Sequence, residues 1–170
     1  MLEVNIRTLA LALAAVLGAV LQPGGEAAGQ VALGTQLSMT EYVVDENSWG
    51  PGVRALLKVP FTGLTIQGTY DSFRMPCGPE TCRHRDLGFA LLWSFPLPLL
   101  VDPYLGVGVA PVVEEGWKLN WDVGRTGMYA LGGLWLGGTG GRGTRFFAEA
   151  KHSFRESQLF VSAGFLLFLF

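Results

Sequence analysis

The segment Asp86–Phe95, DLGFALLWSF, decides the fold class because large apolar residues occupy every second position. A period of two is the periodicity of a β-strand, in which successive side chains point to opposite faces. One face of this strand is therefore expected to be strongly apolar, while the other is small and polar. The apolar face would carry Leu87, Phe89, Leu91, Trp93 and Phe95.

The same alternation recurs after Gly29 in segments that end at glycine, proline, asparagine or aspartate. It predicts eight strands at about residues 30–44, 52–61, 64–73, 86–95, 101–113, 127–136, 144–154 and 158–170. The sixth segment is hydrophobic and glycine-rich on both faces, and the eighth is apolar on both faces toward its end. The pattern therefore leaves the register of these two strands open.

The expected connections alternate in length. Longer, charged loops are predicted at residues 45–51, 74–85 and 114–125, whereas residues 62–63, 96–98 and 137–143 form short or glycine-rich turns. Residues 155–157 make a short last loop, which is an exception. Long loops on one side and short turns on the other are typical of transmembrane β-barrels.

Composition supports a membrane barrel. The chain has 170 residues, of which 49% are hydrophobic and only 15% charged, so it is not a disordered chain. Its net charge of −2 provides no basic surplus for nucleic acid. Mean hydropathy is +0.35, yet no apolar run reaches the roughly 18 residues of a spanning helix.

A strand-based membrane protein must close its sheet, because every backbone N–H and C=O group in hydrocarbon has to be paired. Eight strands close a barrel whose lumen is filled by side chains. The expected fold is an all-β, eight-stranded antiparallel up-and-down transmembrane β-barrel without an open pore, as a monomer.

The N-terminus has the features of a cleaved signal peptide. Arg7 precedes an unbroken apolar stretch at residues 9–21, and a polar segment with small residues follows up to Gly29. The prediction is a signal peptide at residues 1–28 and a barrel domain at residues 29–170. An uncleaved anchor or an ordinary core helix is the alternative.

Cys77 and Cys82 are the only cysteines. An exported chain enters an oxidising compartment, and the Gly-Pro sequence between the two cysteines allows the chain to fold back. We expect a disulfide that rigidifies the tip of a hairpin. A redox motif would need two intervening residues, and a zinc site would need more ligands.

Charged residues on the expected inner faces of the strands predict an interior charge network. Four cations and three anions could neutralise one another inside the barrel. The predicted members are Arg54, Lys58, Asp71, Asp86, Arg145, Glu149 and Lys151.

The eight segments, the run Phe147–Lys151 and the terminal Phe168–Phe170 resemble small outer-membrane β-barrels of the OmpA/OmpX type. The resemblance covers essentially the whole mature chain. It implies a bacterial outer-membrane location, contact with outer-membrane lipid and lipopolysaccharide, and recognition of Phe168 and Phe170 by the insertion machinery. Gly164 shares the parity of these aromatics, which leaves open which face of the last strand meets lipid.

The sequence leaves two alternatives to a structural or surface-interaction role. A lipid A-modifying barrel enzyme would use His152 and Ser153 with Glu156, but adjacent strand residues point to opposite faces. A soluble lipocalin-like barrel would need an apolar interior, which the inward charges oppose. We therefore expect no enzyme activity, no cofactor and no metal.

A basic cluster adjoins the cysteines and could contact an anionic lipopolysaccharide headgroup. It consists of Arg74, Arg83, His84 and Arg85.

Overall fold

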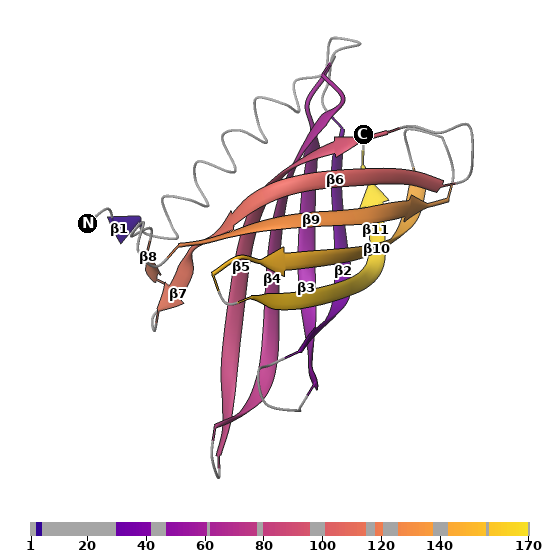
Figure 1. Cartoon of the computed structure of the whole chain (residues 1–170). Coiled ribbons are helices and arrows are strands. Elements are labelled where there is room, and N and C mark those ends of the chain that lie inside the picture. Colours follow the sequence, from indigo (N-terminus) through magenta and orange to yellow (C-terminus); the bar gives the residue numbers. More distant parts are fainter. Residues whose placement is uncertain are drawn as a thin grey trace.

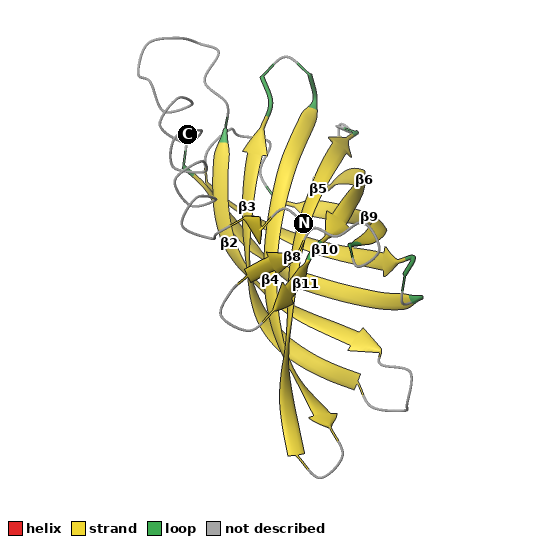
Figure 2. Cartoon of the chain, turned by 90° about the vertical axis from the view of Figure 1, so that its left-hand side faces the viewer, coloured by secondary structure: helices red, strands yellow, loops and turns green. Residues whose placement is uncertain are grey.

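The computed structural model describes residues 3–4, 30–41, 47–60, 62–77, 80–95, 101–114, 118–120, 126–137, 143–155 and 157–169. Eight of its strands close into one antiparallel barrel (Figures 1 and 2), which confirms the predicted fold class. The barrel strands are β2 (Val31–Glu41), β3 (Asn47–Lys58), β4 (Leu64–Cys77), β5 (Glu80–Ser94), β6 (Val101–Ala110), β9 (Gly127–Leu136), β10 (Gly143–Ser153) and β11 (Gln158–Phe168).

Each barrel strand pairs with its neighbour in the chain, and β11 pairs with β2 to close the ring. A separate small sheet contains β1 (Glu3–Val4), β8 (Lys118–Asn120) and β7 (Val112–Glu114). The predicted cleavage point near Ala28 lies outside the described residues. No helix within the described part of the chain is long and apolar enough to cross a membrane.

The barrel has two different ends. At one, which we call the turn end, β3, β5, β9 and β11 end and β2 begins, and the Leu169 N–H donates to the Val31 carbonyl at 2.9 Å. The strands β2, β4, β6 and β10 end at the opposite end, which we call the loop end. Here β4 and β5 extend beyond the other strands (lower part of Figure 1).

This extension is a two-stranded ribbon, residues 72–77 and 80–85, which we call the β4–β5 ribbon. Pairing of β3 with β4 stops at Asp71, and pairing of β6 with β5 stops at Phe89, whereas β4 and β5 stay paired as far as Cys77 and Glu80. The prediction of a loop at residues 74–85 was therefore wrong over most of its length. Charged residues occur in these strands because the ribbon lies beyond the closed sheet.

Prolines account for two further differences from the predicted bounds. Pro51, expected in a loop, belongs to β3, where it precedes the pairing of β3 with β4, so its missing N–H interrupts no ladder. Pro111 separates β6 from β7 and ends the fifth barrel strand earlier than predicted.

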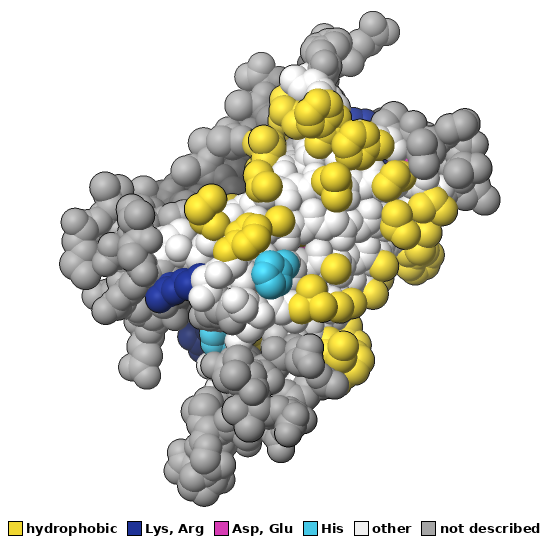
Figure 3. Space-filling view, in the orientation of Figure 1, with side chains coloured by type: hydrophobic (Ala, Val, Ile, Leu, Met, Phe, Trp, Pro, Cys, Tyr) yellow, Lys and Arg dark blue, Asp and Glu magenta, His cyan; other side chains and the backbone are white. Residues whose placement is uncertain are grey.

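Side chains alternate between a lipid-like exterior and a filled interior. Large apolar side chains are exposed on all eight strands, among them Leu37, Val53, Ile66, Leu91, Val107, Leu134, Phe146 and Phe165. Figure 3 shows such side chains spread over the described surface of one face. The structure also settles the sixth segment, in which Tyr129, Leu131 and Trp135 face inward.

The interior is layered along the barrel axis. An apolar cluster fills the turn end and includes Leu56, Leu92, Tyr104, Trp135 and Leu166. A smaller apolar contact, between Phe73 and Phe160, lies toward the loop end, with ring centroids 6.0 Å apart. Buried polar side chains lie between the two.

Glycines allow the closing strands to approach closely. A Cβ atom on Gly34 would lie 2.0 Å from the Phe165 carbonyl oxygen, and one on Gly164 would lie 2.1 Å from the Thr35 carbonyl oxygen. Both contacts join β2 and β11, so any larger residue would force these strands apart.

Candidate functional site

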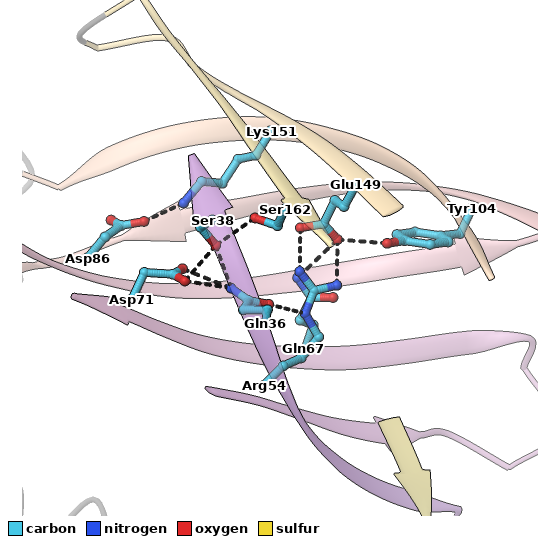
Figure 4. Close-up of polar contacts among 10 residues, drawn as sticks. All are labelled: Gln36, Ser38, Arg54, Gln67, Asp71, Asp86, Tyr104, Glu149, Lys151 and Ser162. Carbon is cyan, nitrogen blue, oxygen red and sulfur yellow. Dashed lines mark hydrogen bonds and ion pairs between the residues drawn. The ribbon is translucent and has the colours of Figure 1, made fainter. Parts of the chain in front are cut away.

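A buried ion pair lies at the centre of the interior (Figure 4). Arg54 on β3 donates from Nη1 to Glu149 Oε2 at 2.9 Å and from Nη2 to Oε1 at 2.8 Å. The two side chains are 0% and 3% exposed. The planar guanidinium matches a carboxylate in this two-bond arrangement, which fixes the distance between β3 and β10.

Glu149 has further donors. The Tyr104 hydroxyl donates to Oε2 at 2.9 Å, and Gln67 Nε2 donates to the same oxygen at 3.4 Å. Arg54 in turn places its Cζ 3.9 Å from the ring centroid of Phe147. The ion pair is therefore enclosed by hydrogen bonds and an aromatic face, as a buried charge pair requires.

Gln36 connects this ion pair to a second acidic centre. Its Oε1 accepts from Arg54 Nε at 2.8 Å, while its Nε2 donates to both carboxylate oxygens of Asp71 at 2.7 and 2.9 Å. Ser38 also donates to Asp71 at 2.7 Å and lies 2.8 Å from the Ser162 hydroxyl oxygen. One polar network thus joins β2, β3, β4, β6, β10 and β11.

A second ion pair lies nearer the loop end. Lys151 on β10 donates to Asp86 on β5 (Figure 4). Its Nζ lies 4.3 Å from the ring centroid of Phe160 and 5.1 Å from that of Tyr129. The ammonium group is thus held by one carboxylate and two aromatic rings.

Six of the seven predicted interior charges lie inside the barrel, at three places. Arg54, Glu149 and Asp71 belong to one network, and Asp86 pairs with Lys151. Arg145 lies apart at the turn end, with its Nη1 3.8 Å from Asp102 Oδ2. The prediction was wrong for Lys58, which ends β3 with an exposed side chain and joins none of these groups, because the strand has reached the rim of the barrel there.

The sequence did not single out Asp102, Gln36, Gln67 or Tyr104 as members of the interior. Each lies at an inward position of its strand. The alternation of inward and outward positions along the sequence was therefore the signal that could have identified them. The Gln67 Oε1 and Tyr129 hydroxyl atoms are buried and have no hydrogen-bond partner in the described part of the chain.

The side chains of His152 and Ser153, which a hydrolase site would have to bring together, point to opposite faces of β10. His152 is exposed on the exterior, 5.5 Å from Phe154 between ring centroids, whereas Ser153 lies on the interior side. Glu156 lies outside the described residues. Among the residues that are described, no group of three or more His, Cys, Asp or Glu side chains could hold a metal ion.

The β4–β5 ribbon gathers the basic cluster by register. Arg74 lies opposite Arg83, Ser72 opposite Arg85, and Phe73 opposite His84. Cys77 pairs with Glu80 and Met75 with Cys82, but the cysteine side chains lie outside the described part, so the disulfide stays a prediction.

The terminal aromatics differ in what the structure describes. Phe168, the last residue of β11, is partly buried against the interior apolar cluster, and its ring centroid lies 5.0 Å from Arg145 Cζ. Phe170 lies outside the described residues.

Comparison with known proteins gives structural relatives but no sequence family. No family model and no curated protein matches the chain. Neisserial surface protein A has a similar structure, with a TM-score of 0.60 and 14% identity over 83% of this chain and 97% of that one.

Two further barrels match over 83% of this chain, each at 12% identity. A de novo designed transmembrane β-barrel matches with a TM-score of 0.53 over 96% of its length, and the N-terminal β-barrel domain of Pseudomonas aeruginosa OprF with 0.50 over 99%. Identities this low show the fold alone. The chain thus has the fold of the small eight-stranded outer-membrane β-barrels, the fold that its resemblance to the OmpA/OmpX type predicts.

Proposed function

We propose that this chain is a monomeric integral protein of the bacterial outer membrane that acts through contacts at its loop end, and that it neither catalyses a reaction nor forms a pore. The observation that carries the proposal is the distribution of polarity. Ion pairs and hydrogen-bonded side chains occupy the middle of the interior, beside an apolar cluster at the turn end, whereas large apolar side chains cover the outside. A soluble carrier of apolar ligands would instead need a polar outer surface.

Aromatic side chains at both ends support insertion in a bilayer. Trp93 is 60% exposed near the turn end, where it stacks on Phe95, and Trp49 is 58% exposed near the loop end. Aromatic girdles at the two interfaces are typical of transmembrane barrels. Trp135, by contrast, is buried inside the barrel and does not belong to such a girdle.

The layered interior supports a closed lumen. Leu92 and Trp135 are buried at the turn end, and the Arg54–Glu149 pair lies buried above them. Eight strands leave only enough interior volume for side chains. A role in conduction is therefore not proposed.

The unequal ends support an orientation. Short turns face the periplasm in such barrels and longer loops face outward. The turn end would then be periplasmic, and the β4–β5 ribbon would project from the cell. Outer-membrane lipid, lipopolysaccharide and the insertion machinery are the proposed partners, with Phe168 and Phe170 as the insertion signal.

Fractionation of cells that express the full chain tests this proposal. We expect the protein in the outer-membrane fraction and expect its gel mobility in detergent to change on boiling, because closed barrels resist cold detergent. A variant that lacks residues 1–28 is the control and should fail to reach that fraction. A soluble periplasmic protein whose mobility does not change on heating would refute the proposal.

A further inference from the structure

Three arginines share the outward face of the β4–β5 ribbon. Register places Arg74 opposite Arg83, and Arg85 lies two residues from Arg83 on the same face of β5. Arg74 and Arg83 are exposed, and Arg85 is partly buried. We call these three residues the arginine patch.

The patch continues the lipid-facing columns of the barrel. Along β4 the outward positions run through Ile66 and Tyr70 to Arg74, and along β5 they run from Trp93 through Leu87 to Arg83. Charge therefore begins on the same face where the apolar surface ends.

The depth of the patch follows from strand geometry. Ten residues separate Trp93 from Arg83 on β5, which corresponds to about 34 Å along a strand at about 3.4 Å per residue. With a tilt of about 40°, this is about 26 Å along the membrane normal, close to the roughly 25 Å height of the apolar band of such barrels. With Trp93 at one interface, the patch lies at the opposite headgroup layer.

The arrangement of like charges also indicates an anionic ligand. Like charges directly opposite each other on paired strands repel. In the described part of the chain neither Arg74 nor Arg83 forms an ion pair, and the neighbouring Asp86 is bound by Lys151 on the interior face. An anion on the outward face would relieve this repulsion.

We propose that the arginine patch binds the phosphate groups of an anionic glycolipid in the outer leaflet, of the phosphorylated lipid A class. This inference rests on the proposed outer-membrane location. Guanidinium groups bind phosphate oxygens through paired N–H donors, and the position of the patch matches the depth of lipid phosphates. The ribbon would thereby fix the barrel to its surrounding lipid.

Energy transfer from tryptophan to dansyl-labelled diphosphoryl lipid A in phosphatidylcholine vesicles measures this binding to the inserted barrel. Each cation near an anionic surface contributes roughly a fivefold gain in affinity. The double variant Arg74→Gln/Arg83→Gln should therefore bind on the order of 30-fold more weakly. Lys58→Gln, which removes an exposed cation at the opposite end, should bind like the native protein.

Further variants and ligands in the same binding experiment identify the group that the patch binds. Arg74→Lys/Arg83→Lys should retain most of the binding, and dephosphorylated lipid A should bind weakly to the native protein. Equal binding by all variants, or equal binding of dephosphorylated lipid A, would overturn the proposal. Displacement by soluble tripolyphosphate at the same phosphate concentration would assign the patch to free phosphate and overturn the lipid assignment.

The heat-dependent gel shift is recorded for every variant. If Arg74→Gln/Arg83→Gln keeps the shift but binds lipid A as tightly as the native protein, the result counts against the patch alone. Loss of the shift from the native protein would instead count against the proposed membrane barrel.

Discussion

Removing the carboxylate of the central ion pair should strongly destabilise the barrel. In Glu149→Ala, Arg54 keeps its position inside but loses both of its bonds to the carboxylate, at 2.8 and 2.9 Å. The Tyr104 hydroxyl loses its acceptor as well. Because the Arg54 side chain has no exposed surface, water cannot easily replace these partners.

The magnitude follows from the cost of an uncompensated buried charge. Breaking a buried ion pair by removing one partner costs roughly 3–5 kcal/mol. Gln36 still accepts from Arg54 Nε at 2.8 Å, which places the expected loss in the free energy of unfolding nearer the lower value, about 3 kcal/mol. Replacing both charges, as in Arg54→Met/Glu149→Leu, leaves no isolated charge and should cost no more than either single change.

Urea unfolding of the barrel in lipid vesicles, followed by tryptophan fluorescence and by the heat-dependent gel shift, measures these differences. Four proteins complete a double-mutant cycle: the native chain, Arg54→Met, Glu149→Leu and the double variant. A loss below about 1 kcal/mol for Glu149→Ala would refute the reasoning. So would a double variant whose loss equals the sum of the two single losses, because the charges would then act independently.

Three further changes test other parts of the fold. Gly164→Val places a side chain against a β2 backbone oxygen, since even a Cβ atom there would lie 2.1 Å away, and should lower the temperature at which the barrel loses its cold-detergent gel mobility. Val107→Arg places a charge on the lipid-facing surface of β6 and should destabilise the barrel more in urea unfolding than Phe154→Arg, which lies just beyond the end of β10, because the cost of such a charge falls from roughly 2–4 kcal/mol at the midplane to roughly 0–1 kcal/mol at an interface. Reduction of the predicted disulfide between Cys77 and Cys82 should expose two thiols to maleimide labelling yet leave the gel shift unchanged, because the ribbon tip lies beyond the closed barrel.

Each change has a control and a result that would contradict it. Ala163→Val, on the exposed outer face of β11, places the same valine side chain beside Gly164 and should be tolerated; an equal loss in both would contradict a contact at the closing strands. Equal costs for the two arginine substitutions would contradict the expectation that Val107 lies deeper in the bilayer than Phe154. Thiols that react fully without a reductant would rule out the disulfide.

Strand number, strand faces and barrel closure were predictable because alternation is a local property. Leu91 and Trp93 face outward and Leu92 inward, as their spacing predicts. The inward positions of Arg54 and Glu149 followed from the same rule. The alternation did not predict which face of the segment 127–136 is turned inward, because both faces are hydrophobic. Pairing with β6 and β10 decides that Tyr129 faces the lumen.

The partners of the interior charges were not predictable. Arg54 and Glu149 are separated by 95 residues in sequence, and only the closed ring brings β3 and β10 across from each other. The β4–β5 ribbon was also missed as strand, because its arginines and prolines suggest a loop when no membrane boundary is known. Loop and strand differ there only by pairing, which sequence composition does not encode.

The cross-lumen ion pairs restrict how the chain can enter a bilayer. Arg54 and Glu149 belong to β3 and β10, and Asp86 and Lys151 to β5 and β10, so no single hairpin contains a complete pair. A hairpin that entered alone would carry an unneutralised charge into hydrocarbon, which is strongly unfavourable. Glu149 and Lys151, the partners of Arg54 and Asp86, both belong to the last hairpin, β10–β11. The energetically accessible route is one in which the strands curl into a nearly complete ring first and cross the lipid together.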